Sequence, residues 1–152
     1  MNSATFQDAT PFELEWISEQ LASGVKFVKK YAPEIAGQDL TLEALDAAWS
    51  AWIATDPSGS EDISSAINSV GIPFGAILVE GGVFSWCIAT DDYGTDLAVR
   101  ALPNRGDVLI YPADFVSKRW EERVTDFLVG AYPQIIQHVE SLKAEWDEAK
   151  PL

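Results

Sequence analysis

The sequence predicts an α+β domain: N-terminal helices, then a three-stranded antiparallel meander, then C-terminal helices. Apolar residues recur at three- and four-residue spacing before residue 80 and after residue 112, as they do on helices. Between these segments they alternate every second residue, and glycine, proline and aspartate separate the runs, as in strands joined by tight turns. The 152 residues suffice for one core, so we expect a single domain over residues 1–152.

The first helix has signals at both ends. Residues 10–13, Thr-Pro-Phe-Glu, match a capping box with proline at the first helical position. Lys29 and Lys30 suit the negative end of the helix dipole, and Pro33 cannot continue the helix. We therefore expect a helix over Pro11 to Tyr31. Its apolar stripe is Leu14, Ile17, Leu21, Val25 and Val28.

Two more helices are expected before the strands. The second opens at Thr41 and stops at the turn residues 56–59, Asp-Pro-Ser-Gly. The third starts near Ser60. Gly71 and Pro73 should kink or break it, because proline lacks the N–H that a helix interior needs.

Three strands are expected in the middle of the chain. They are Val83 to Thr90, Leu97 to Leu102, and Val108 to Tyr111. The first turn, residues 91–94, combines aspartate chemistry with a glycine that can take positive φ, and residues 103–106 form the second turn. Such short connections join antiparallel neighbours, so a meander results.

Two helices are expected at the C-terminal end. A short one follows Pro112, and Pro133 either kinks the final helix or marks its start. The apolar stripe of the final helix is Leu128, Ala131, Ile135, Val139, Leu142 and Trp146.

The charge balance indicates which partners to expect. Ten basic residues stand against twenty-four acidic ones, a net charge of −14. This argues against nucleic acid and anionic membranes, since both attract proteins through lysine and arginine. It favours solubility and attraction to a protein partner with a basic surface.

Several features predict a cytoplasmic protein. Residues 1–10 lack the basic and apolar segments of a signal peptide. The longest run free of strongly polar residues, Gly71 to Val79, is too short to span a bilayer. Cys87 is the single cysteine, so no disulfide can form within the chain.

Residue types for catalysis and metal binding are scarce. His138, the single histidine, lies beside the stripe of the final helix, and Cys87 lies mid-strand among small residues. One histidine and one cysteine cannot build a usual zinc site. The hairpin acids lack the spacing of a calcium loop, and no phosphate-binding or dinucleotide pattern is present. We expect no catalytic residue, no metal and no cofactor.

One basic cluster has two interpretations. It comprises Lys118, Arg119 and Arg123, with Trp120 between them. In the structural interpretation, Arg119 forms an ion pair with acids of the hairpin. Those acids are Asp91, Asp92 and Asp96. In the functional interpretation, Lys118 and Arg119 form a site for a small anion or an acidic peptide.

Tryptophans and glycines on the helices also have two interpretations. Trp49 and Trp52 share one helix face, which is typical of core packing. Together with Trp120 they could instead form an aromatic surface for a partner. Gly71 and Gly75, four residues apart, indicate close packing of a helix against its neighbour rather than a phosphate loop.

Four motifs resemble a bacterial domain family of unknown function. They are Phe74-Gly75, Trp86, Asp92-x-Gly94-x-Asp96-Leu97-Ala98 and Val116-x-Lys118-Arg119. The similar stretch runs from about Leu42 to Tyr132, so the first helix lies outside it. The resemblance implies a small α+β domain with a hairpin and implies no particular activity.

Three functions follow as hypotheses. The first is a non-catalytic protein-interaction or accessory module, favoured by the acidic surface and the scarcity of catalytic residue types. The second is a small-anion or small-ligand sensor that uses Lys118 and Arg119. The third is an enzyme that uses carboxylates, which requires acids that converge in one pocket.

Overall fold

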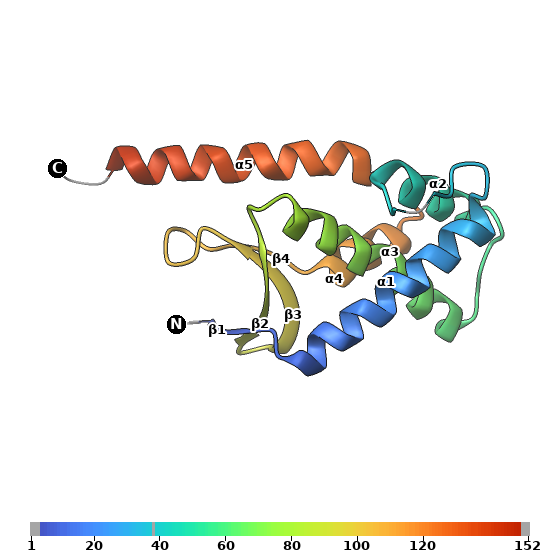
Figure 1. Ribbon diagram of the computed structural model, residues 1–152, viewed down its shortest axis with the longest axis horizontal. Coiled ribbons are helices and arrows are strands. Elements are labelled where there is room, and N and C mark those ends of the chain that lie inside the picture. The colour runs from blue at the N-terminus through green and yellow to red at the C-terminus, as the bar shows by residue number, and fades with distance from the viewer. Residues whose placement is uncertain (1–3, 38, 150–152) are drawn as a thin grey trace.

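A computed structural model describes residues 4–37 and 39–149 and has the predicted α+β architecture. The elements are β1 (Thr5–Asp8), α1 (Pro11–Tyr31), α2 (Leu42–Ile53), α3 (Ser60–Glu80), β2 (Ser85–Asp91), β3 (Gly94–Ala101), β4 (Val108–Ile110), α4 (Pro112–Glu121) and α5 (Leu128–Ala149). In Figure 1 the curved sheet lies at one end, α1 to α4 gather beside it, and α5 runs along the top.

The sheet has one more strand than the sequence predicted. Its order is β1-β2-β3-β4 and every pair is antiparallel, so β2, β3 and β4 form the expected meander. β1 pairs with the outer side of β2, with Phe6 opposite Ala89. Its four residues are too few to show an alternating pattern. The two edges of the sheet are therefore β1 and β4.

The predicted helix starts are confirmed for α1 and α2. The Glu13 carboxylate accepts hydrogen bonds from the Thr10 backbone N–H at 3.0 Å and from the Thr10 hydroxyl at 2.7 Å. These bonds, led by the backbone one, hold the pKa of Glu13 below its ordinary value. The Thr41 hydroxyl oxygen accepts from the Ala44 N–H at 3.1 Å at the start of α2.

Of the two outcomes expected at Gly71 and Pro73, a kink or a break, the break is wrong. The helix is continuous over Ser60–Glu80, and Pro73 lies buried inside it. Proline removes the N–H that would reach the Ser69 carbonyl. That carbonyl instead faces Gly24 of α1, where a Cβ atom would stand only 2.7 Å from its oxygen. Tight packing on both sides thus holds α3 together at the cost of one hydrogen bond.

The glycine spacing in α3 has the structural role that the sequence predicted. A Cβ atom on Gly71 would lie 2.8 Å from the Pro112 carbonyl oxygen, and one on Gly75 would lie 2.7 Å from the Pro112 ring and the Trp86 ring. Both glycines therefore let α3 approach the start of α4 and the sheet.

α3 is also long and apolar enough to cross a membrane by length and composition alone. Half of this apolar stretch is buried inside the protein, where α3 packs against α1 and α4. This is the pattern of a core helix.

Pro133 does not mark the start of α5, which runs over Leu128–Ala149 and contains this proline. The start of α5 is fixed by Asp46 of α2, a residue far away in the sequence, which is 5% exposed. One of its oxygens accepts from the N–H groups of Phe127 at 3.2 Å and Leu128 at 2.9 Å. The other accepts from the Val129 N–H at 2.9 Å. Asp46 therefore caps a helix about eighty residues further along the chain.

A second carboxylate fixes the loop between β3 and β4. One oxygen of Asp107 accepts from Nε of Arg100 at 2.9 Å, from Nη2 of Arg100 at 2.6 Å and from the Asn104 N–H at 2.9 Å. Burial opposes the ionisation of Asp107, but the bonds from Asn104 and Arg100 outweigh it, and its pKa lies below the ordinary 3.8.

Replacing Asp107 with asparagine is expected to weaken the acid dependence of stability. A carboxyl group with a lowered pKa in the folded state stabilises the fold above its unfolded-state pKa, and this stabilisation is lost as the pH falls through the folded-state pKa. Asparagine tolerates the positive φ of 46° here, so the variant changes charge rather than backbone strain. The free energy of unfolding can be measured in urea at pH 7 and near pH 3. The difference between the two values should be smaller for Asp107→Asn than for the parent. An unchanged difference would assign the acid dependence to other groups.

Candidate functional site

The basic cluster does not pair with the hairpin. In the described part of the chain, no carboxylate lies within ion-pair distance of Arg119, so the expected pair with Asp91, Asp92 or Asp96 is absent. Arg119 turns back along α4 instead. Its guanidinium lies 4.1 Å from the centre of the Phe115 ring, and Nη1 donates to the Phe115 carbonyl at 3.4 Å. Its charge is therefore not neutralised by an acid.

The two other basic residues of the cluster point elsewhere. Nζ of Lys118 lies 3.2 Å from a carboxylate oxygen of Asp114, and both side chains are more than half exposed. Such a surface pair contributes little to stability. Arg123 follows the end of α4, and its guanidinium lies 3.6 Å from the centre of the Trp120 ring and bonds the Trp120 carbonyl. The three cations thus do not converge on one point.

The tryptophans do not form an exposed aromatic surface. Trp49 is fully buried and Trp52 is 3% exposed, so the core interpretation is the one that the structure supports. The Trp49 indole N–H donates to the Val124 carbonyl at 2.9 Å. Trp120 is half-buried, and its ring centre lies 5.1 Å from that of Trp52.

The hairpin acids have the turn role that their pattern indicated. One oxygen of Asp91 accepts from the Tyr93 N–H at 2.8 Å, and one oxygen of Asp96 accepts from the Leu97 N–H at 2.8 Å. Asp92 is exposed at the tip. Gly94, with φ of 134°, closes the turn.

Two of these acids also border a cavity of about 240 Å³. Its lining residues are Ala89, Asp91, Tyr93, Gly94, Thr95, Asp96, Tyr111 and Asp114. Burial, together with the charges of Asp91 and Asp96, raises the pKa of the Tyr111 phenol, so its proton stays in place at neutral pH. Three carboxylates and the phenol oxygen of Tyr111 line the cavity, which suits a cationic group. Among the described residues, no three acidic, histidine or cysteine side chains lie close enough to hold a metal ion, so the carboxylates do not meet at one point. The carboxylate-enzyme hypothesis stays a prediction.

Two further cavities adjoin this one along β4 and α4. A cavity of about 200 Å³ shares Tyr111 and Asp114 with the acidic cavity and reaches Lys118 and Arg119. A third, of about 360 Å³, shares Arg119 and lies between β4, α4 and α5. It is lined by Val108, Leu109, Ile110, Phe115, Arg119, Ala131, Gln134, Ile135 and His138. We call these three adjoining cavities the β4 groove.

The β4 groove borders a free strand edge. β4 is last in the sheet, and among the described residues its one strand partner is β3. The backbone groups on the outer side of an edge strand are those that can pair with another chain. The groove is acidic at the end near Asp91 and Asp96, cationic in the middle cavity near Lys118 and Arg119, and mainly apolar at the far end near Ile135.

The sequence indicated only part of this groove. Lys118 and Arg119 stood out by their charge, whereas Asp114 did not stand out, and Ile110 and Ile135 were expected only as apolar residues of a strand and a helix. The missing information was that β4 is an edge strand and that α5 crosses beside it, which depends on tertiary packing. His138, predicted at the boundary of the stripe of the final helix, does line the groove.

The fold and the groove define a small α+β domain with a free sheet edge. The family model described as "Domain of unknown function (DUF3806)" matches residues 46–132, more than half of the chain, and the chain belongs to this family. No curated protein and no solved structure matches the chain. The resemblance to a family of unknown function is therefore confirmed, while a bacterial source stays a prediction.

The extent of the match agrees with the predicted stretch and leaves α1 outside. It begins at Asp46 and ends at Tyr132, so it contains both sides of the contact between Asp46 and the start of α5. The whole hairpin and α4 also lie within it.

Proposed function

We propose that the protein is a non-catalytic interaction module that binds an extended segment of a partner protein along β4. The observation that carries this proposal is the free edge of β4 beside a groove of adjoining cavities. A peptide added as a further strand satisfies the edge backbone groups, and its alternate side chains enter the cavities.

The lining of the groove sets the chemistry of the segment. Asp91, Asp96 and Asp114 favour a lysine or arginine side chain at one end. In the middle, the unneutralised Arg119 favours an acidic side chain. At the other end, Val108 and Ile135 favour apolar side chains.

The charge of the whole chain supports the same kind of partner. With a net charge of −14, the surface attracts a protein whose surface around the segment is basic, and this attraction weakens as salt rises. The proposal places the encounter in the cytoplasm and involves neither nucleic acid nor membrane.

A displayed peptide library, selected at low and moderate salt, tests the proposal. Enriched peptides should carry a basic residue at one end, apolar residues at the other, and an acidic residue between them. Arg119→Gln should weaken the binding of a selected peptide about tenfold, since a charge-assisted bond is lost. Arg123→Gln removes the same charge outside the groove and should leave binding within about twofold.

A steric pair of variants separates the groove from general charge effects. Gln134 and Gln137 are both exposed on α5, but only Gln134 is among the groove lining. Gln134→Trp should block the selected peptides and Gln137→Trp should not. Equal binding by both variants, or a library without enrichment, would contradict the proposal.

A further inference from the structure

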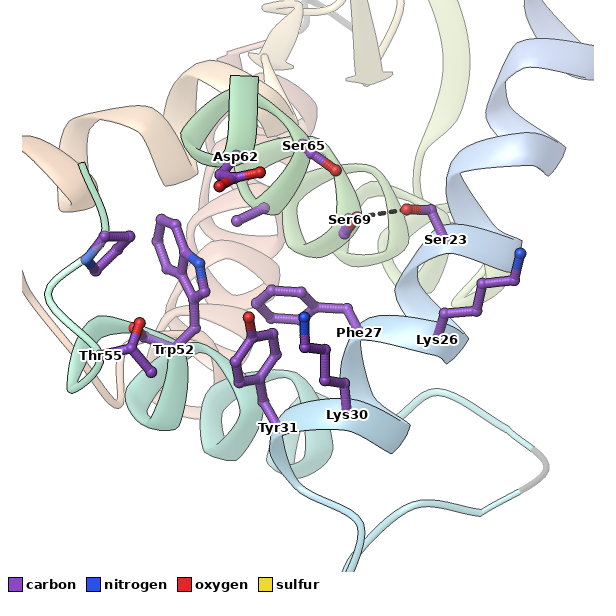
Figure 2. A pocket seen from close by; sticks show the side chains of 12 residues that line it. Ser23, Lys26, Phe27, Lys30, Tyr31, Trp52, Thr55, Asp62, Ser65 and Ser69 are labelled. Atoms are coloured by element: carbon purple, nitrogen blue, oxygen red, sulfur yellow. Dashed lines mark hydrogen bonds between the residues drawn. The ribbon is translucent and has the colours of Figure 1, made fainter. Parts of the chain in front are cut away.

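A separate pocket of about 370 Å³ lies between α1, α2 and α3, away from the β4 groove. Its lining residues are Ser23, Lys26, Phe27, Lys30, Tyr31, Trp52, Thr55, Pro57, Asp62, Ser65, Ala66 and Ser69. Figure 2 shows α1 residues along one side, Trp52 and Thr55 on a second, and Asp62, Ser65 and Ser69 of α3 on a third. Its volume falls within the range of small-molecule sites.

Aromatic rings form one part of the pocket wall. The ring centres of Phe27 and Tyr31 are 4.9 Å apart, and the Phe27 ring meets the Trp52 ring edge-on at 6.3 Å. Trp52 is 3% exposed, so the core holds its indole in place and leaves a small surface open. Such a wall suits a flat apolar group.

Two lysines give the pocket an excess of positive charge. Lys26 and Lys30 lie one turn apart on α1, where like charges repel each other. Within residues 4–37 and 39–149, neither ammonium group has a carboxylate at ion-pair distance. Asp62 is the one acid in the lining, so cations outnumber it. A bound anion would relieve this repulsion.

A partly buried pair of hydroxyls adds hydrogen-bonding capacity. The oxygens of Ser23 and Ser69 are 2.7 Å apart, and Ser69 is 2% exposed (Figure 2). Two hydroxyls that bond each other use one hydrogen and keep a second for another acceptor. The exposed Ser65 hydroxyl lies on the same side of the pocket.

From these features we infer that this pocket binds a small anion that carries a flat ring, as a ring carboxylate or a ring phosphate ester. The ring packs against Phe27 and Trp52. The anionic group bonds Lys26 and Lys30 and accepts from the serine pair. The lysines belong to α1, outside the family match, so this site is assigned to the present chain rather than to the family.

The sequence held a signal for this site. Lys26, Lys29 and Lys30 are three cations within five residues of an acidic chain, a denser group than Lys118, Arg119 and Arg123. The helix dipole accounts for Lys29 and Lys30 near the end of α1, but Lys26 lies further from that end.

Four probes test the inference with the full chain. Phenyl phosphate and benzoate carry both a ring and an anion, inorganic phosphate carries the anion alone, and benzamide carries the ring alone. At ten times its dissociation constant, a ring anion should raise the melting temperature by about 3–6 °C. The two control probes should give much smaller shifts. The ratio of the affinities for phenyl phosphate and benzoate shows whether the site prefers a phosphate ester or a carboxylate. A ligand that binds the folded state raises its melting temperature. If none of the four probes shifts the melting temperature at about 10 mM, the inference is overturned.

Matched variants locate the binding. The double variant Lys26→Gln with Lys30→Gln should weaken the binding of the ring anion at least tenfold. Lys29→Gln removes a neighbouring charge on α1 that does not line the pocket, and it should change affinity by less than about threefold. Ser65→Phe should fill the pocket and abolish binding. Because Ser65 is exposed, this substitution should leave the fold intact. Equal losses of affinity from Lys29→Gln and from the double variant of Lys26 and Lys30, or normal binding by Ser65→Phe, would also overturn the inference.

Discussion

Replacing Asp46 with alanine is expected to lower the free energy of unfolding by about 3–5 kcal/mol. Its carboxylate accepts three backbone N–H bonds at the start of α5, from residues 127, 128 and 129. The bond to Leu128 is buried, so alanine leaves an N–H group with neither a protein acceptor nor ready access to water. The variant also removes a negative charge from the positive end of the helix dipole.

Urea unfolding monitored by circular dichroism measures this effect. Asp46→Ala should move the midpoint down by about 2 M. Asp46→Asn is the matched control, because it keeps one acceptor oxygen in the same place but loses the charge and the second acceptor. The urea midpoint of Asp46→Asn should fall by about half as much as that of Asp46→Ala. A midpoint for Asp46→Ala within experimental error of the parent would show that α5 starts without this cap.

Local signals in the sequence predicted most of the elements because those signals act within a few residues. Glu13 and Thr41 stabilise the helix starts next to them, and Gly94 closes the turn between its own two strands. These interactions need no information from the rest of the fold. The α+β class and the order of helices and meander follow from them.

Long-range contacts caused the errors. α3 continues through Pro73 because α1 and α4 pack against it, and proline chemistry alone cannot indicate this. β1 forms because β2 offers an edge, although Thr5–Asp8 is only four residues long. α5 starts at Leu128 because Asp46 reaches its first N–H groups.

The candidate sites were harder to predict than the fold, for the same reason. Arg119 was singled out by its charge, yet its position over Phe115 and its place in the β4 groove depend on α4 and the edge of the sheet. Asp114 carries no signal of its own, and the apolar stripe that contains Ile135 indicates a packed helix face rather than a groove. A groove is made by elements that meet, and a single sequence does not show which ones do.

Replacing Gly71 with alanine is expected to destabilise the protein by about 2 kcal/mol, although alanine is the better helix former. A Cβ atom at this position would lie 2.8 Å from the Pro112 carbonyl oxygen and 3.0 Å from Cα of Ala113. Both are backbone atoms, so no side chain can rotate away, and α3 and α4 must move apart. This movement opens the core around Phe74 and outweighs the gain of about 1 kcal/mol in helix propensity.

Gly130 provides the matched control because it also lies in a helix but has open space around it. Nothing comes within 4 Å of a Cβ atom built there. Gly130→Ala should therefore stabilise the protein by about 0.5–1 kcal/mol through helix propensity alone. Thermal unfolding of the two variants should show shifts of opposite sign. If both variants stabilise the protein, the approach of α3 to α4 is looser than the structure has it, and the continuous α3 would need another explanation.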